Sequence, residues 1–381
     1  MNSWTRPVTT WSGHKSHVLA IAFSSDGKDM ALGFQDGVMS IVNIHTKQKQ
    51  VFRASSSVIA LRFSPDGTYL VSESRPYGVN APCGEHVITL LNRATAKQNI
   101  LQGQWGSIVL NQRLCFSPDS TRLYVAAARN LVHINVATSD VEKLLQGHTT
   151  ENLYSVAISR DSKHIASVSD REVCVWDYAT GRCLSTAPLP TYMWRGALCT
   201  FSTNNHCRLI GVDNEYRWQL VDTTTQKHLS NTDQDGRCLN LWFEFSSDGK
   251  YFTTESYTQL KVWSVSTGVC CRTLDLMVLS SSGDRICLKS VAFTPDCCHL
   301  ATGWGDGCVR MWPLFDAPFV SEYATPLLEC AVAPYITVDI VDLLLANAAR
   351  TCFETESAFL HFQKINLITH LQQSLKNHRN V

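Results

Sequence analysis

The chain has 381 residues, of which 44% are hydrophobic, and its 33 Lys and Arg residues balance 33 Asp and Glu residues. This hydrophobic content is sufficient for a sizeable core and excludes wholesale disorder. A formal net charge of zero gives no global attraction to nucleic acid or to an anionic membrane, so neither is an expected partner.

The 15 cysteines are scattered along the chain, with doublets at Cys270-Cys271 and Cys297-Cys298. No C-x-x-C pair occurs and no spacing matches a zinc site, so no metal is expected. The first residues, MNSWTRPVTTW, contain no apolar segment typical of a signal peptide. No apolar run approaches the length that spans a bilayer. We therefore expect an intracellular protein, cytoplasmic or nuclear or both, whose cysteines are mostly small, reduced core residues.

A short element recurs seven times along the chain: an aromatic or aliphatic residue, then Ser or Thr, then a turn. Its copies begin at Phe23, Phe63, Phe116, Ile158, Phe201, Phe245 and Phe293, at intervals of 40, 53, 42, 43, 44 and 48 residues. A second element, an apolar residue or Trp followed four positions later by Thr, keeps step with it from Val42/Thr46 to Trp263/Thr267. In the seventh copy Trp312 is present, but Asp316 stands where Thr would be. Two marks that share one period indicate internal repeats.

Each repeat resolves into short strands separated by turn residues. In the fourth repeat the predicted strands are LYSVAIS, HIASVS, EVCVWDY and RCLST, with turns at Asp161-Ser162, at Asp170 and at Thr180-Gly181. Four strands in about 43 residues are typical of one blade of a β-propeller. A blade cannot bury both of its faces alone, so the repeats are expected to stack in a ring of seven blades.

The chain resembles the WD-repeat family over roughly residues 5–315. The residues that carry the resemblance are Gly147-His148 with Trp176-Asp177 in the fourth repeat and Gly13-His14 in the first. The resemblance implies a buried hydrogen-bonded set of His, Ser or Thr, a turn Asp and Trp in each blade. The implied members are His148, Ser167, Asp170 and Trp176 in the fourth blade, His14 and Asp36 in the first (where Val42 replaces Trp), and Asp306 and Trp312 in the seventh. Their expected role is structural rather than catalytic.

The two ends of the repeat region are expected to meet in one blade. The last repeat supplies only three strands, CLKSVAF, HLATGWG and CVRMWPL, and the segment Trp4–Trp11 precedes the first Gly-His where an outer strand belongs. Pairing it with the last repeat would remove the open sheet edges. We therefore assign residues 1–318 to an all-β, seven-bladed propeller whose N-terminal strand completes the last blade.

Residues 319–381 follow a different pattern. Apolar residues recur at steps of three and four, which predicts amphipathic helices over 336–350 and 357–378. The expected C-terminal extension is a short helical hairpin. Two alternatives stay open: it packs on the propeller, or it docks a partner.

Insertions into the repeats gather on one predicted face, at residues 73–86, 102–108, 187–196 and 277–286. They bring residue types that dominate protein interfaces, namely Arg75, Tyr77, Trp105, Tyr192, Trp194 and Arg195. These six are candidate partner-binding residues. The alternative is that the aromatic side chains cap their own blades.

The sequence predicts a non-enzymatic scaffold that binds partner proteins or peptides through this loop-rich face. It contains no G-x-S-x-G, P-loop, G-x-G-x-x-G or H-E-x-x-H motif, so neither an enzyme nor a cofactor is expected. The alternative function is a substrate receptor of a ubiquitin ligase, in which the C-terminal helices dock the ligase subunits. The sequence leaves open the partner's identity, the pathway and the oligomeric state.

Overall fold

The computed structural model describes residues 7–75, 86–103, 105, 113–150, 153–169, 171–189, 197–201, 207–212, 218–222, 227–230, 244–256, 258–276, 278–279 and 285–314. Every regular element within these ranges is a β-strand. The helices expected over 336–350 and 357–378, and the whole extension 319–381, lie outside the described residues.

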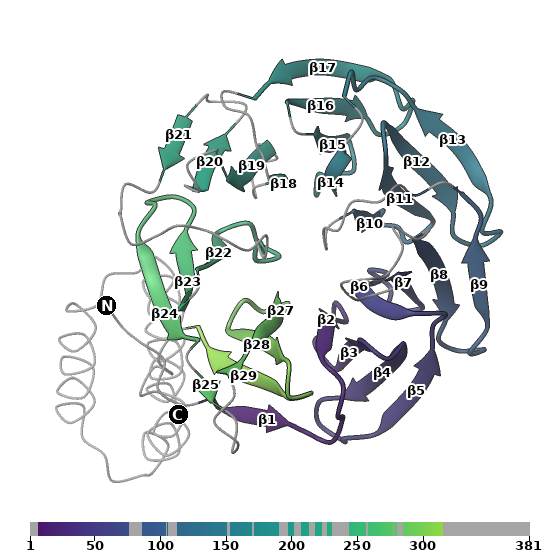
Figure 1. Ribbon diagram of the computed structural model, residues 1–381. Helices are drawn as coiled ribbons and strands as arrows, with labels where there is room; N and C mark the ends of the chain where they lie inside the picture. The colour runs from purple at the N-terminus through teal and green to yellow at the C-terminus, as the bar shows by residue number, and fades with distance from the viewer. Residues whose placement is uncertain are drawn as a thin grey trace, which may run out of the picture. The chain divides into compact units, whose positions relative to one another are not determined.

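Apart from one two-stranded hairpin, the described strands form seven sheets arranged around one centre, which confirms the prediction of seven blades (Figure 1). Blades 1 and 2 consist of β2 (Val18–Phe23), β3 (Asp29–Phe34), β4 (Val38–Asn43) and β5 (Lys49–Arg53), and of β6 (Ser57–Phe63), β7 (Tyr69–Arg75), β8 (Val87–Asn92) and β9 (Gln98–Leu101). Blades 3 and 4 consist of β10 (Leu114–Phe116), β11 (Arg122–Ala127), β12 (Asn130–Asn135) and β13 (Val141–Leu145), and of β14 (Leu153–Ile158), β15 (His164–Ser169), β16 (Glu172–Asp177) and β17 (Cys183–Pro188).

Blades 5 to 7 complete the ring. Their strands are β18 (Ala197–Phe201), β19 (Cys207–Val212), β20 (Trp218–Asp222) and β21 (Lys227–Ser230); β22 (Tyr251–Glu255), β23 (Gln259–Ser264) and β24 (Cys270–Asp275); and β27 (Leu288–Phe293), β28 (His299–Trp304), β29 (Val309–Pro313) and β1 (Thr9–Trp11). A short hairpin of β25 (Val278–Leu279) and β26 (Arg285–Ile286) precedes blade 7. In blade 6 the position of the innermost strand is marked by a single bridge between Phe245 and Phe252.

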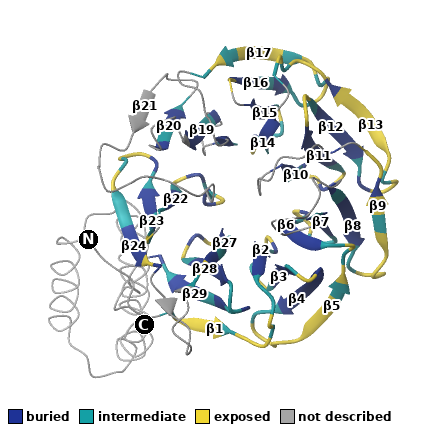
Figure 2. Cartoon of the chain, viewed as in Figure 1, coloured by how far each residue is buried: buried dark blue, intermediate teal, exposed yellow. Residues whose placement is uncertain are grey.

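Burial follows the position of a strand within its blade. Inner strands such as β2, with the sequence VLAIAF, are buried along most of their length because both faces of the blade are covered. Outer strands such as β5, β13 and β17 are largely exposed (Figure 2). Inner strands such as β2 therefore read as nearly continuous apolar segments, whereas the outer strands β5 and β13 carry charged residues.

The core lies between the blades. Seven clusters of buried apolar residues occur, and each combines side chains of two adjacent blades. One of them joins blade 7 to blade 1, with Ala292, Ala301 and Met311 packed against Val18 and Met30. The apolar core is thus continuous around the ring.

The N-terminal strand closes the ring, as expected from the sequence. β1 pairs antiparallel with β29, with Thr9 opposite Met311 and Trp11 opposite Val309. The N–H of Val8 donates to the carbonyl of Met311 at 2.8 Å. Residues more than 290 positions apart in the sequence therefore share one blade.

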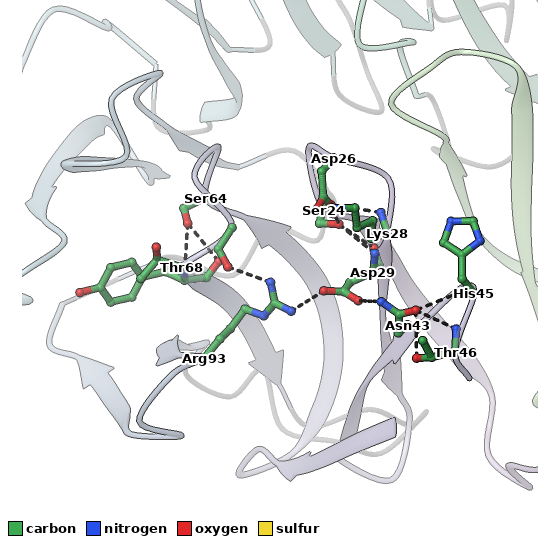
Figure 3. A network of polar contacts seen from close by, with 12 residues as sticks. Ser24, Asp26, Lys28, Asp29, Asn43, His45, Thr46, Ser64, Thr68 and Arg93 are labelled. Atoms are coloured by element: carbon green, nitrogen blue, oxygen red, sulfur yellow. Dashed lines mark hydrogen bonds and ion pairs between the residues drawn. The ribbon is translucent and has the colours of Figure 1, made fainter. Parts of the chain in front are cut away.

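The recurring Phe-Ser element forms the turn between the first two strands of a blade. In blade 1 the Ser24 hydroxyl donates to Asp26 Oδ1 at 2.7 Å, and the N–H of Lys28 donates to the same oxygen at 3.1 Å (Figure 3). The Ser or Thr hydroxyl contacts the Asp carboxylate in the same way at Ser64/Asp66, Ser117/Asp119, Ser159/Asp161, Ser246/Asp248 and Thr294/Asp296. The copy that follows Phe201 lies outside the described residues.

A polar link crosses from blade 2 to blade 1 close to these turns. Arg93 donates to Asp29 Oδ2 at 2.5 Å and to the carbonyl of Gly67 at 2.8 Å, while the Asn43 amide donates to the other oxygen of Asp29 at 2.8 Å (Figure 3). The arginine side chain therefore joins one turn of its own blade to the second strand of the preceding blade.

Removal of residues 1–12 is expected to destabilise the whole ring, because the edge of β29 and the apolar cluster between blades 7 and 1 lose their cover. Thermal unfolding should show a melting temperature lower by several degrees, since about 1 kcal/mol corresponds to 2–4 °C in a large domain. Removal of residues 1–6 alone, which leaves β1 in place, is the matched control. Equal melting temperatures for the two truncated proteins would contradict a closing role for β1.

The turn carboxylates predict sensitivity to acid. The Ser24 hydroxyl and the Lys28 N–H hold the pKa of Asp26 below its usual value, and the Ser159 hydroxyl does the same for the pKa of Asp161. A lowered pKa in the folded state stabilises the protein above the ordinary Asp pKa of about 3.9, and this stabilisation is lost as the pH falls below it. The melting temperature should therefore fall below about pH 4, and by less in Ser24→Ala/Ser159→Ala protein. An equal fall in both proteins would exclude these turns as a source of the acid sensitivity.

Candidate functional site

His148 and Trp176 converge on one hydroxyl group in blade 4. Ser167 on β15 and Trp176 on β16 are diagonal neighbours across the antiparallel pair. The indole N–H of Trp176 donates to Ser167 Oγ at 2.8 Å, and His148 Nε2 lies 2.7 Å from the same oxygen. Ser167 is 0% exposed and Trp176 1%. The structure thus brings together three of the four residues that the family resemblance implied.

Glu172 supplies the carboxylate beside this set. Its Oε1 accepts hydrogen bonds from the N–H of Thr149 at 2.5 Å and from the Thr149 hydroxyl at 3.0 Å, and it lies 3.5 Å from His148 Nδ1. Glu172 was not among the residues predicted from the sequence, and Asp170, the predicted acidic member of the set, lies outside the described residues. Placement of Glu172 at the start of β16, directly after the turn, was the available signal.

The Trp–hydroxyl pair recurs in two more blades. Trp263 donates to Thr254 Oγ1 at 2.8 Å in blade 6, and Trp312 donates to Thr302 Oγ1 at 2.8 Å in blade 7. Trp304 also donates to Thr302 Oγ1, at 2.8 Å. Neither acceptor threonine was identified from the sequence. Asp306 interacts elsewhere: its carboxylate accepts from Arg310 at 2.7 Å and from the N–H of Cys308 at 2.9 Å.

Three of the four blades without a tryptophan at this position also lack the hydroxyl. Blade 2 is the exception, because Leu91 stands at its tryptophan position and the hydroxyl of Ser72 donates instead to the carbonyl of Thr89 at 3.5 Å. On the second strand of a blade, the acceptor position lies two residues after the residue that pairs with the tryptophan position. This acceptor position holds Leu32 in blade 1, Val125 in blade 3 and Gly211 in blade 5. Val42, Ile134 and Val221 stand at the tryptophan positions of these blades. A buried indole N–H without an acceptor is costly, whereas two apolar groups need no partner. In blades 1, 3 and 5 the two positions therefore change together.

The expected set in blade 1 is accordingly incomplete. His14 Nε2 lies 3.7 Å from Asp36 Oδ2, and its ring stacks on Phe34 with a centroid distance of 3.8 Å. With Leu32 and Val42 in place of the hydroxyl and the indole, stacking replaces the hydrogen bond.

The candidate partner-binding residues fall into two groups. Trp105 is 3% exposed and packs in the core cluster between blades 2 and 3, so its indole is not available at the surface. Arg75 ends β7 and is half-buried. The other four, Tyr77, Tyr192, Trp194 and Arg195, lie outside the described residues.

A buried charged network lies beside Trp105. Glu73 on β7 contacts His86 Nδ1 through Oε1, and the same oxygen lies 3.2 Å from Arg113 Nη2. Arg113 also donates to the carbonyl of Trp105 at 2.7 Å. The exposed fractions are 0% for Glu73, 5% for His86 and 1% for Arg113. Sequence periodicity did not single out any of these three charged residues.

No three His, Cys, Asp or Glu side chains of the described residues lie close enough together to hold a metal ion. Within the same part of the chain, no helix is long and apolar enough to cross a membrane.

Replacement of Trp176 by Ala is expected to reduce the free energy of unfolding by about 3–5 kcal/mol, as for a large buried aromatic side chain. Ser167→Ala should cost about 1–3 kcal/mol for each buried group left without a partner, because Trp176 and His148 both lose their contact. Chemical denaturation of the variants, with Ser185→Ala on the exposed strand β17 as control, measures both effects. A cost for Ser167→Ala no larger than that for the control would contradict a structural role of the set.

Comparison with known proteins identifies the repeats. The family model WD40, described as WD domain, G-beta repeat, matches residues 5–43, 46–75, 139–177 and 268–313. Three of these segments begin with the outer strand of one blade and end with the third strand of the next, for example β13 with β14, β15 and β16. A sequence repeat therefore spans two blades, which explains why the first repeat begins with the strand that completes the last blade.

The chain is similar to parts of longer proteins, one of which is named as a WD-repeat protein. WD repeat-containing protein 90 from Homo sapiens is 22% identical over 345 residues, which cover 84% of this chain and 19% of that protein. The 66 kDa stress protein from Physarum polycephalum is 23% identical over 290 residues, covering 64% of this chain and 46% of that protein. The chain thus spans less than a fifth of the first relative and less than half of the second. The chain thus contains WD40 repeats, matched in four segments, within a β-propeller of seven blades closed into a ring.

Proposed function

We propose that this propeller is a non-enzymatic scaffold that binds partner proteins or peptides through the face on which its repeats differ most. Propellers of the WD40 family are typical protein-interaction scaffolds. The proposal includes action inside the cell, in cytoplasm or nucleus, and the absence of a catalytic group or cofactor. The free thiols of the described cysteines are consistent with a reducing compartment.

The observation that carries the proposal is the contrast between the two faces. In an antiparallel four-stranded blade, the turn between strands one and two opens on one face, and the turn between strands two and three opens on the other, together with the connection to the next blade. The first face carries the six similar Ser/Thr–Asp turns. The second holds the described strand ends that flank residues 76–85, 106–112 and 190–196, where the sequence departs from the repeat. Recognition of one specific partner needs a surface that is not repeated, which favours the second face.

The outer rim provides an alternative surface that an experiment has to separate from the loops. Val51, Ile100 and Leu144 occupy the same register position on the outer strands of blades 1 to 3, with exposed fractions of 58%, 60% and 50%. The same position carries Thr10, Thr186 and Thr273 in blades 7, 4 and 6. Threonine is thus compatible with the fold at this position.

Affinity purification of three matched proteins tests the proposal: the wild type, Tyr192→Ala/Trp194→Ala/Arg195→Ala, and the rim variant Val51→Thr/Ile100→Thr/Leu144→Thr. The loop variant is expected to recover at least about tenfold less of a specific partner than the wild type, because aromatic and Arg side chains supply most of the binding energy of interfaces. The rim variant should retain it, and both should keep the wild-type melting temperature. Loss of the partner from the rim variant alone would overturn binding through the loop-rich face. Co-purification of cullin or adaptor subunits would favour the alternative, a substrate receptor of a ubiquitin ligase.

A further inference from the structure

Blade 4 holds two free thiols at neighbouring cross-strand positions. Cys174 lies on β16 opposite Thr186, and Cys183 lies at the start of β17 opposite Trp176. Both cysteines are free. Since side chains alternate between the two faces of a strand, Cys174 and Trp176 share one face, and so do the residues opposite them. The two thiols therefore lie on the same face of the strand pair.

Both sulfur atoms contact the hydroxyl group of Thr186. Its oxygen Oγ1 lies 3.4 Å from Cys174 Sγ and 3.6 Å from Cys183 Sγ. A register shift leaves Leu184 of β17 without an opposite residue, and such a bulge bends the strand locally. Diagonal neighbours in a regular sheet have Cα atoms about 7–8 Å apart, and a disulfide bond joins Cα atoms up to about 7 Å apart. A small movement of β17, the last strand of its sheet, therefore brings the two sulfur atoms within bonding distance.

The fold requires a cysteine at neither position. In the other six blades the position of Cys174 holds Ser40, Thr89, Val132, Gln219, Lys261 and Arg310. The position of Cys183 holds Lys49, Gln98, Val141 and His228 in four blades, and a second cysteine, Cys270, in blade 6. Among these cross-strand positions of the described residues, only blade 4 combines two thiols.

Cys270 in blade 6 provides a matched reference for Cys183. Its Sγ lies 3.6 Å from Thr273 Oγ1, as Cys183 Sγ lies 3.6 Å from Thr186 Oγ1. Lys261 takes the place of Cys174, and the strand β23 carries no cysteine. Blade 6 thus has the same thiol beside the same hydroxyl group, but no second thiol across the strand pair.

The two thiols of blade 4 differ in their access to solvent. Cys174 is 0% exposed, whereas Cys183 is half-buried. Burial raises the pKa of the Cys174 thiol to about 12, and the neighbouring Cys183 raises it further. Because an oxidant reacts with an accessible thiolate, it reaches Cys183 first. Cys174 can react only with a group that is already beside it.

We propose that Cys174 and Cys183 form a modification site, which hydrogen peroxide converts into a reversible disulfide bond between β16 and β17. The Cys183 thiolate attacks one peroxide oxygen: an S–O bond forms, the O–O bond breaks, and hydroxide leaves and takes up a proton to become water. The Cys174 sulfur then loses its proton and attacks the Cys183 sulfur: the S–S bond forms, the S–O bond breaks, and a second water leaves. The two thiols thus give two electrons to one peroxide molecule, and a thiol reductant reverses the reaction by exchange. The modification is a property of the propeller itself and does not depend on the proposed partner binding.

Peptide mapping of the full chain tests the bond directly, because trypsin cleaves after Arg182, between the two cysteines. Peptide 172–182 contains only Cys174, and peptide 183–195 contains only Cys183. The protein is treated with hydrogen peroxide, its remaining thiols are blocked, and the single-chain band of a non-reducing gel is digested. Mass spectrometry should find the two peptides joined, and dithiothreitol should separate them. Absence of the joined peptides, or links from Cys183 to other cysteines in equal amounts, would overturn the proposal.

Replacement of the buried thiol tests its part in the reaction. At the same peroxide dose, Cys174→Ser is expected to raise the amount of sulfinic acid at Cys183 at least about tenfold, because the sulfenic acid no longer condenses with a neighbouring thiol. Cys174→Val is a second variant that should behave in the same way, and Ser40 and Val132 show that both replacements fit this position in other blades. Sulfinic acid at Cys270 is the internal reference and should be equal in all three proteins. Equal amounts at Cys183 in the wild type and both variants would contradict the disulfide.

Discussion

No blade of this protein can cover its own two faces, and the rest of the structure follows from that constraint. Each of the seven apolar clusters takes side chains from two neighbouring blades, so a blade removed from its neighbours would expose both faces to water. Only a closed ring satisfies every blade. The pairing of β1 with β29 and the cluster between blades 7 and 1 are therefore conditions of the fold, and they tie the start of the propeller to its end.

Features whose physical cause is local in the sequence were predictable. The Ser–Asp turn lies within six residues, so its repetition along the chain indicates the period, the number of blades and the need for a closing strand. The Trp176–Ser167 pair was also accessible, because the family resemblance supplied both positions. The expected C-terminal helices stay a prediction, because they lie outside the described residues.

Features that depend on cross-strand register or on contacts between blades were not predictable. Thr302 accepts from a tryptophan ten residues away, a spacing one residue longer than that of Ser167 and Trp176, and only the register shows that it occupies the place of Ser167. Trp105 was a candidate partner-binding residue, with capping of its own blade as the alternative, and it is buried between blades 2 and 3. Glu73 and Arg113 are 40 residues apart, and nothing in either local sequence indicates that they meet.

Departures from the repeat differ in how much they destabilise the fold, and this difference distinguishes changes that the fold tolerates from changes that need another explanation. Where a tryptophan and its hydroxyl are both replaced by apolar residues, as at Val42 and Leu32, no polar group is left without a partner, so such changes are tolerated by the fold and carry no functional information. Glu73 and Arg113 are the opposite case, because each is destabilising unless the other is present. A buried pair of this kind adds little stability beyond that of apolar residues, but it fixes one arrangement of the side chains that it joins, because any other arrangement leaves a buried charge without a partner.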